Sequence, residues 1–196
     1  TAMFNLGIVY ELGFGVEKNL TEAINWHRKA ALAGSVEGQT AMGVAYEEGN
    51  GVELNKTEAA HWYRKAVAGG KANAADRLGY LYYAGEGVVK NMTEAVRLWR
   101  VASEADHPQA QFRLGAALQN GDGVEQNATE AVKWWLLAAQ AGDVESTNEL
   151  GLAYHTGDGV EKNATEEVKW LLLAAKAGHP EAQHNVAVCY KSGLGV

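Results

Sequence analysis

The sequence contains a single cysteine, Cys189, and only two prolines, Pro108 and Pro180, in 196 residues. One cysteine cannot form a disulfide within the chain, so the stability of the fold must come from packing. No stretch approaches the roughly 20 consecutive apolar residues that a membrane-spanning helix requires. We therefore expect no direct insertion into a membrane.

Positive charge is also scarce. The chain has 17 Lys and Arg residues against 24 Asp and Glu, which gives a formal net charge of -7 and a pI near 5.4. A surface of this sign repels phosphate backbones, so we expect no nucleic-acid partner. Apolar residues make up 47% of the chain and charged residues 21%, which is typical of a protein with a packed core.

The sequence is rich in internal repetition. Compared with itself, it shows one dominant offset of 36 residues, and segments 109–144 and 145–180 are identical at about 21 of 36 positions. The motif Gly-x-Gly-Val returns at this spacing without an insertion, at 13–16, 49–52, 85–88, 121–124, 157–160 and 193–196. We therefore predict a single repeat domain over 1–196, part of a longer array, with units 1–36, 37–72, 73–108, 109–144, 145–180 and a partial unit 181–196.

Each unit begins with a helical pattern. A small residue, a leucine, a glycine and a tyrosine recur near a period of 3.6, as at Ala2, Leu6, Gly7 and Tyr10. The two glycines of Gly-x-Gly-Val end this helix, because glycine enters the left-handed region at little steric cost. Glycine inside a helix costs about 1 kcal/mol against alanine, so the repeated Gly7 position predicts a close crossing with the second helix of the unit.

A second helical pattern follows in each unit. It starts at an asparagine that can cap the helix, with a glutamate three residues later that can complete a capping box, as at Asn19 and Glu22. Its apolar stripe is predicted at the positions of Ala23, Trp26, Ala30 and Ala33. Five full units and a partial one thus predict about eleven helices, paired as helix-turn-helix hairpins.

These residues form the pattern A-x-x-x-L-G-x-x-Y-x-x-G-x-G-V-x-x-N-x-T-E-A-x-x-W, which resembles the Sel-1-like repeat (SLR) family, relatives of the tetratricopeptide repeats, over essentially the whole chain. The resemblance implies an all-α fold, a right-handed α-α superhelix or solenoid of 36-residue helix-turn-helix repeats. It also implies service as an adaptor or scaffold in larger assemblies. Some bacterial relatives carry a disulfide in every unit, and this chain departs from them.

Other interpretations of single motifs are weaker. A phosphate-binding Gly-x-Gly would need a strand before it, and a helix precedes it here. The six histidines are not spaced as metal ligands, so we expect no metal and no cofactor. Cys189 stands at a small apolar position of the repeat and is expected to be buried rather than nucleophilic. Glu167 breaks the repeat at a position that is otherwise alanine, and we expect it to be solvated.

Each capping asparagine also begins an Asn-x-Thr sequon. The helix cap explains the same residues without any sugar, so N-glycosylation is the alternative interpretation. The possible glycosylation sites are Asn19, Asn55, Asn91, Asn127 and Asn163.

A partner surface is expected where the repeat varies. By resemblance to tetratricopeptide repeats, the first helices line the concave side, and on them aromatic residues stand beside arginines, a mixture typical of interface anchors. We expect an extended peptide or a partner helix to dock there. The alternative is that the tyrosines only cover the neighbouring core. The predicted partner-binding residues are Asp76, Arg77, Tyr80, Tyr83, Phe112, Arg113, Gln119, Asn120, Asn148, Leu152 and His155.

The sequence therefore predicts a protein-protein interaction scaffold or adaptor that binds through the first helix of each repeat. We expect no enzyme activity and no small-molecule substrate, because no catalytic set stands at positions that the repeat leaves unexplained. The alternative is a non-catalytic structural or regulatory subunit of a larger enzyme or membrane-associated complex.

Overall fold

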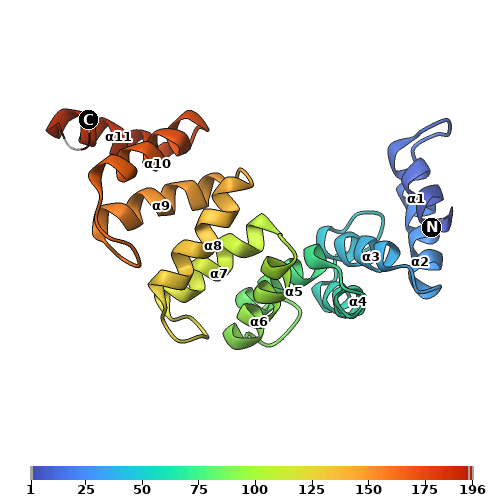
Figure 1. Cartoon of the computed structure of the whole chain (residues 1–196). Coiled ribbons are helices and arrows are strands. Elements are labelled where there is room, and N and C mark those ends of the chain that lie inside the picture. The colour runs from blue at the N-terminus through green and yellow to red at the C-terminus, as the bar shows by residue number, and fades with distance from the viewer. Residues whose placement is uncertain (1, 194, 196) are drawn as a thin grey trace. The chain divides into compact units, whose positions relative to one another are not determined.

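The computed structural model describes residues 2–193 and 195, and all the regular structure in this part of the chain is helical (Figure 1). Contacts divide the chain into two compact units, Thr1–Leu98 and Trp99–Val196, with the boundary inside one helix. The predicted eleven helices are confirmed for the described residues: α1 (Ala2–Leu12), α2 (Leu20–Leu32), α3 (Val36–Glu48), α4 (Lys56–Ala68), α5 (Ala72–Ala84), α6 (Met92–Glu104), α7 (Pro108–Asn120), α8 (Ala128–Gln140), α9 (Val144–Thr156), α10 (Ala164–Lys176) and α11 (Pro180–Ser192).

Within each unit, the helices pack as successive hairpins. In the first unit α1 packs on α2 and α3 on α4, while α2 also packs on α3 and α4 on α5. In the second unit α7 pairs with α8 and α9 with α10, and α8 and α10 pack on the following first helices, α9 and α11. A first helix is thus covered by its own partner and by the second helix of the preceding hairpin.

Asparagine caps the second helix of every full repeat. Oδ1 of Asn55, for example, accepts a hydrogen bond from the backbone N–H of Glu58 at 3.1 Å, and Oδ1 of Asn163 does so from Glu166. The predicted capping box is wrong for the last of these helices, because the Glu166 carboxylate accepts hydrogen bonds from Lys169 and Trp170 along the helix instead. The cap therefore comes from asparagine alone.

The main core side chain of the second helix lies one position after the predicted tryptophan. This core position is held by residues of varied chemistry, and it is buried throughout: His27, Tyr63, Trp99, Trp135 and Leu171. Each described contact of this position places the side chain on the helical glycine of the same hairpin. A Cβ on Gly43 would lie 2.5 Å from Cδ1 of Tyr63, and one on Gly151 would lie 2.7 Å from Leu171. The predicted close crossing is real, but a side chain rather than a backbone fills it.

Of the tryptophans of the predicted stripe, Trp62 is buried and the others lie at the edge of the core. Trp26 and Trp170 are half-buried, and a lysine ammonium lies over each ring, from Lys29 at 4.1 Å and Lys169 at 5.5 Å from the ring centroid. Tryptophan suits this position because its ring covers apolar surface while its face attracts a cation.

Backbones do approach closely, but between successive repeats. The second glycine of Gly-x-Gly-Val lies on the first residue of the preceding second helix: a Cβ on Gly51 would come within 2.8 Å of the Leu20 carbonyl oxygen. Gly87 makes the same approach to Lys56, and Gly159 to Ala128. These glycines also have positive φ, so the motif serves both to end one helix and to join two repeats.

Candidate functional site: the inter-repeat junctions

Polar side chains and cavities recur at one place in the repeat, which we call the inter-repeat junction. It is formed by the two helices of one hairpin and the first helix of the next. Junction 1 lies among α1, α2 and α3, junction 2 among α3, α4 and α5, junction 4 among α7, α8 and α9, and junction 5 among α9, α10 and α11. Equivalent repeat positions line all of them.

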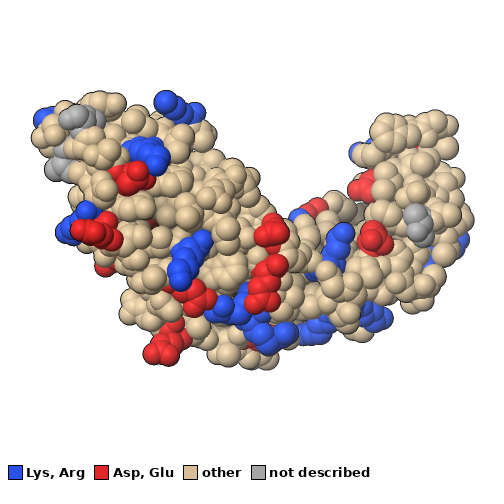
Figure 2. All heavy atoms as spheres, in the orientation of Figure 1, with Lys and Arg blue, Asp and Glu red and all other residues tan. Residues whose placement is uncertain are grey.

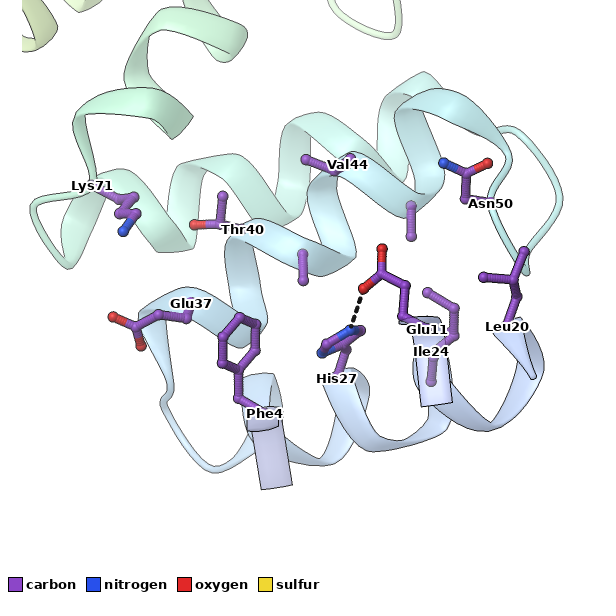
Figure 3. A pocket seen from close by; sticks show the side chains of 13 residues that line it. Phe4, Glu11, Leu20, Ile24, His27, Glu37, Thr40, Val44, Asn50 and Lys71 are labelled. Atoms are coloured by element: carbon purple, nitrogen blue, oxygen red, sulfur yellow. Dashed lines mark hydrogen bonds and ion pairs between the residues drawn. The ribbon is translucent and has the colours of Figure 1, made fainter. Parts of the chain in front are cut away.

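Junction 1 holds a cavity of about 270 Å³ with mostly apolar walls. Figure 3 shows Phe4 and His27 on one wall and Glu11 reaching into the cavity. His27 is buried, and its Nε2 lies 3.3 Å from Oε2 of Glu11, whose side chain is 52% exposed. The rings of Phe4 and His27 are 5.2 Å apart. The result is an apolar pocket with a carboxylate at its mouth.

Ionic and hydrogen-bonded side chains bridge junction 2. Glu47 Oε2 accepts hydrogen bonds from the Tyr63 hydroxyl at 2.5 Å and from Nη1 of Arg77 at 2.8 Å. Nζ of Lys56 lies 3.8 Å from the other carboxylate oxygen of Glu47. Burial, together with the hydrogen bond to Glu47, raises the pKa of Tyr63. The hydroxyl therefore stays protonated and keeps donating to the carboxylate.

Junction 4 holds a smaller cavity of about 100 Å³, with Gln119, Trp135 and Glu149 among its lining residues. The indole of Trp135 is buried and donates from Nε1 to the Phe112 carbonyl at 3.3 Å. Burial raises the pKa of Glu149, and the negative charges of Glu181 and Glu145 raise it further.

Junction 5 holds a cavity of about 220 Å³ around a buried acid. Glu167 is only 5% exposed, so the expectation that it is solvated is wrong. Its Oε1 lies 2.9 Å from Nδ1 of His155 and accepts a hydrogen bond from Sγ of Cys189 at 3.5 Å. These two groups compensate the carboxylate for the loss of water, which is why a charged residue is tolerated in an alanine position.

The buried position predicted for Cys189 is confirmed, because its side chain lies in the core with Val168 and Leu171. Burial raises the pKa of its thiol, and the adjacent charge of Glu167 raises it further. A thiol in this state is a poor nucleophile. Within residues 2–193 and 195, no three His, Cys, Asp or Glu side chains are placed to hold a metal ion.

The predicted partner-binding residues lie in both units. In the first, Tyr80 and Tyr83 are exposed on α5 with ring centroids 6.0 Å apart, and Arg77 is held in junction 2. Asp76 is buried, with 6% of its surface exposed, so its expected exposure is wrong.

In the second unit, the expected exposure of Asn148 is also wrong. Asn148 is 1% exposed, because α9 is packed between α8 and α10. His155 is exposed and Leu152 half-buried at junction 5, while Asn120 is exposed at the end of α7. Three further predicted residues are half-buried on α7: Phe112, Arg113 and Gln119.

Several junction residues were not predicted from the sequence. Each makes its contacts with another helix, so no local pattern marks it, although the break of the repeat at Glu167 was visible. The residues missed in this way are Glu11, His27, Glu47, Tyr63 and Glu149.

Within the described part of the chain, no helix is both long and apolar enough to cross a bilayer. Acidic and basic side chains are interspersed on the face shown in Figure 2. The sequon asparagines are exposed at the starts of the second helices, and their glycosylation stays a prediction.

Solved structures that are similar to this chain include relatives above 30% identity. A protective antigen present in uropathogenic Escherichia coli strains, which displays an SLR fold, is 35% identical with a TM-score of 0.96, over 100% of this chain and 42% of that one. A Sel1 repeat protein from Oxalobacter formigenes is 34% identical with a TM-score of 0.90, over 97% and 78% of the two chains. The present chain thus spans about two fifths of the first relative.

A third structure, the cysteine-rich protein B of Helicobacter pylori, is 24% identical with a TM-score of 0.55, over 68% of this chain and 96% of that one, and shows the fold alone. No curated protein matches the sequence. The family model "Sel1 repeat" matches residues 1–35, 36–71, 72–107, 108–143, 144–179 and 180–196. The helical hairpins, the solved relatives and this match agree, and the chain belongs to the Sel1 repeat family, a family of α-solenoids that generally act as protein-interaction scaffolds.

Proposed function

We propose that this chain is a scaffold that binds a partner protein through the first helices of its repeats, with the inter-repeat junctions receiving partner side chains. The observation that carries the proposal is the contrast between a constant backbone and varied junction chemistry. Junction 1 is an open apolar pocket, junction 2 is bridged by ion pairs, and junction 5 surrounds a buried carboxylate. Repeat proteins use such variation on a regular frame for recognition.

The exposed pair Tyr80 and Tyr83 on α5 supports the same surface. Tyrosine supplies a large contact area with little loss of conformational entropy, and it is enriched at the energetic centres of interfaces. The Lys90 ammonium lies 5.8 Å from the Tyr83 ring centroid, which keeps a positive charge beside the aromatic surface. This part of the surface therefore offers aromatic contact area beside a positive charge.

A catalytic role is disfavoured. The Sel1 repeat solenoid is typically non-catalytic. Cys189 donates to Glu167, which also contacts His155, but the pKa of the Cys189 thiol is raised. We therefore propose binding without chemistry.

Affinity purification from the native source followed by calorimetry on the purified partner tests the proposal. Tyr83→Ala should weaken binding at least tenfold with an unchanged melting temperature. Leu137→Ala on the second helix α8 is the matched control, since the two side chains are 46% and 44% exposed. If Leu137→Ala weakens binding and Tyr83→Ala does not, the second helices carry the interface and the proposal is wrong.

A further inference from the structure

Junctions 1 and 2 place a glutamate at the same position, 36 residues apart. Glu11 and Glu47 each stand near the end of a first helix, and each accepts a hydrogen bond from the core residue of the second helix, His27 or Tyr63. The backbone and the acid are therefore shared, and what differs is the set of cations around the acid.

At junction 2 the chain supplies its own cations. Nη1 of Arg77, from α5, lies 2.8 Å from Oε2 of Glu47, and Lys56 adds a second positive charge from the start of α4. Glu47 retains only 12% exposure of its side chain. The guanidinium thus bridges the two first helices, and it pairs with Glu47 at 2.8 Å and with Glu48 at 3.5 Å.

At junction 1 both cations are replaced by apolar residues. The position of Arg77 is taken by Ala41, and that of Lys56 by Leu20. Both replacements line the cavity of about 270 Å³, and Glu11 reaches into the same cavity. Among the described residues, Oε1 of Glu11 accepts no hydrogen bond, and the only Lys, Arg or His nitrogen within 4 Å of the carboxylate is Nε2 of His27.

The remaining charges of junction 1 lie away from the acid. Glu37 and Lys71 also line the cavity, and Figure 3 shows them at the end opposite Glu11, beyond Phe4. The positive charge of Lys71 acts on Glu37. The end of the cavity beside Glu11 therefore combines an acidic side chain with apolar walls from Ile24 and Val44.

We propose that junction 1 binds an arginine side chain of the partner protein, in the place that Arg77 occupies at junction 2. The guanidinium would donate to Glu11, as the Arg77 guanidinium does to Glu47, while its methylene stem lies against the apolar walls. Carboxylate oxygens accept two donors readily, and Glu47 Oε2 already does so, so the contact with His27 can persist. This inference rests on the proposed function and names the partner side chain.

The test uses two capped pentapeptides, Ac-Ala-Ala-Arg-Ala-Ala-NH₂ and the same peptide with citrulline, which keeps the shape of arginine without its charge. Titration followed by ¹H–¹⁵N NMR should give saturable shifts in α1, α2 and α3 with the arginine peptide, and at least tenfold weaker binding with citrulline. Equal binding of both peptides, or shifts confined to other helices, would overturn the proposal.

Two variants locate the contact. Ala41→Arg fills the cavity with the chain's own guanidinium and should abolish peptide binding while raising the melting temperature, as a self-occupied junction would. Glu11→Gln should weaken binding at least tenfold, whereas Glu53→Gln, an exposed acid that does not line the cavity, should not. Unchanged binding of the arginine peptide by folded Ala41→Arg protein would show that the proposal is wrong.

The two proposals fail separately. If the arginine peptide does not bind but Tyr83→Ala still weakens the native partner, the scaffold function stands and the arginine pocket is wrong. If the peptide binds and both Tyr83→Ala and Ala41→Arg leave the native partner unaffected, the pocket exists and the scaffold function is wrong.

Discussion

At the scale of single residues, the repeat is held by pairs of positions that must be read together. The helical glycine is required because a large side chain of the second helix packs directly against it. Tyr63 on Gly43 is one such pair. Asp106 shows the converse, a residue out of place: it has a positive φ of 56° where Gly34, Gly70 and Gly142 stand in other repeats. Both cases lead to predictions about stability.

Gly43→Ala should destabilise the protein by about 1–3 kcal/mol, because the added methyl overlaps a fully buried tyrosine ring that has no room to move. Urea denaturation measures the loss. In the double variant with Tyr63→Leu the two costs should not add, since the smaller side chain relieves the overlap. Full additivity would show that the ring and the glycine are independent.

Asp106→Gly should raise the free energy of unfolding by up to about 1 kcal/mol, because glycine adopts the left-handed conformation with less strain. The reciprocal change, Gly142→Asp, is its control: a Cβ there meets nothing within 4 Å, so only the backbone conformation is altered. Thermal melts should move in opposite directions for the two variants, and a shift of the same sign would contradict the explanation.

At the scale of helices, stability depends on how each helix begins and on the charges that face it. Asn163 caps α10 by accepting from two backbone N–H groups. Glu149 on α9 has Glu145 on its own helix, Glu181 and His179 at the start of α11, and buried Asn148 as a hydrogen-bond partner. The Asn163 cap stabilises the fold, whereas the negative charge of Glu149 beside Glu145 and Glu181 destabilises it.

Asn163→Ala should cost about 1 kcal/mol, as the loss of a helix cap generally does. Thr165→Ala is the informative companion, because it removes the sequon and leaves the cap intact. If α10 is glycosylated in the native source, intact mass should fall by a glycan in both variants. If the cap alone accounts for these residues, both masses change only by the substitution and only Asn163→Ala loses stability.

Glu149→Gln should stabilise the protein at pH 7. The raised pKa means that the folded protein holds the proton more tightly than the unfolded chain. Stability is therefore lost as pH rises from the ordinary value of 4.5 through the raised value. Glutamine removes this loss, so the difference from the parent should vanish near pH 4. The exposed Glu125→Gln serves as control in melts across pH 4–8, and a pH-independent difference would refute the assignment.

At the scale of the whole molecule, the sequence predicts one array, because the 36-residue spacing runs through the boundary at residues 98 and 99 without an insertion and α6 is continuous across it. Repeats couple mainly to their nearest neighbours, so we expect a single unfolding transition by calorimetry. Two separate transitions would contradict the single domain.

The helices and their ends could be predicted from the sequence because they depend on residues that recur in the repeats. The core position of His27, Tyr63 and Trp135 could not, since its variety hides its common role. The burial of Glu167 was missed because its partners come from other helices: His155 lies 12 residues before it and Cys189 lies 22 after. Local patterns carry helix formation, whereas the junctions depend on neighbours in space.

The approach of Gly87 to the main chain of Lys56, and of Gly159 to that of Ala128, uses no side chain on either partner. A contact between backbones of this kind does not depend on the side chains of the neighbouring residues. Repeats can therefore be exchanged, duplicated or reordered within such a chain while the side chains that recognise a partner change, because the contact between successive repeats stays the same.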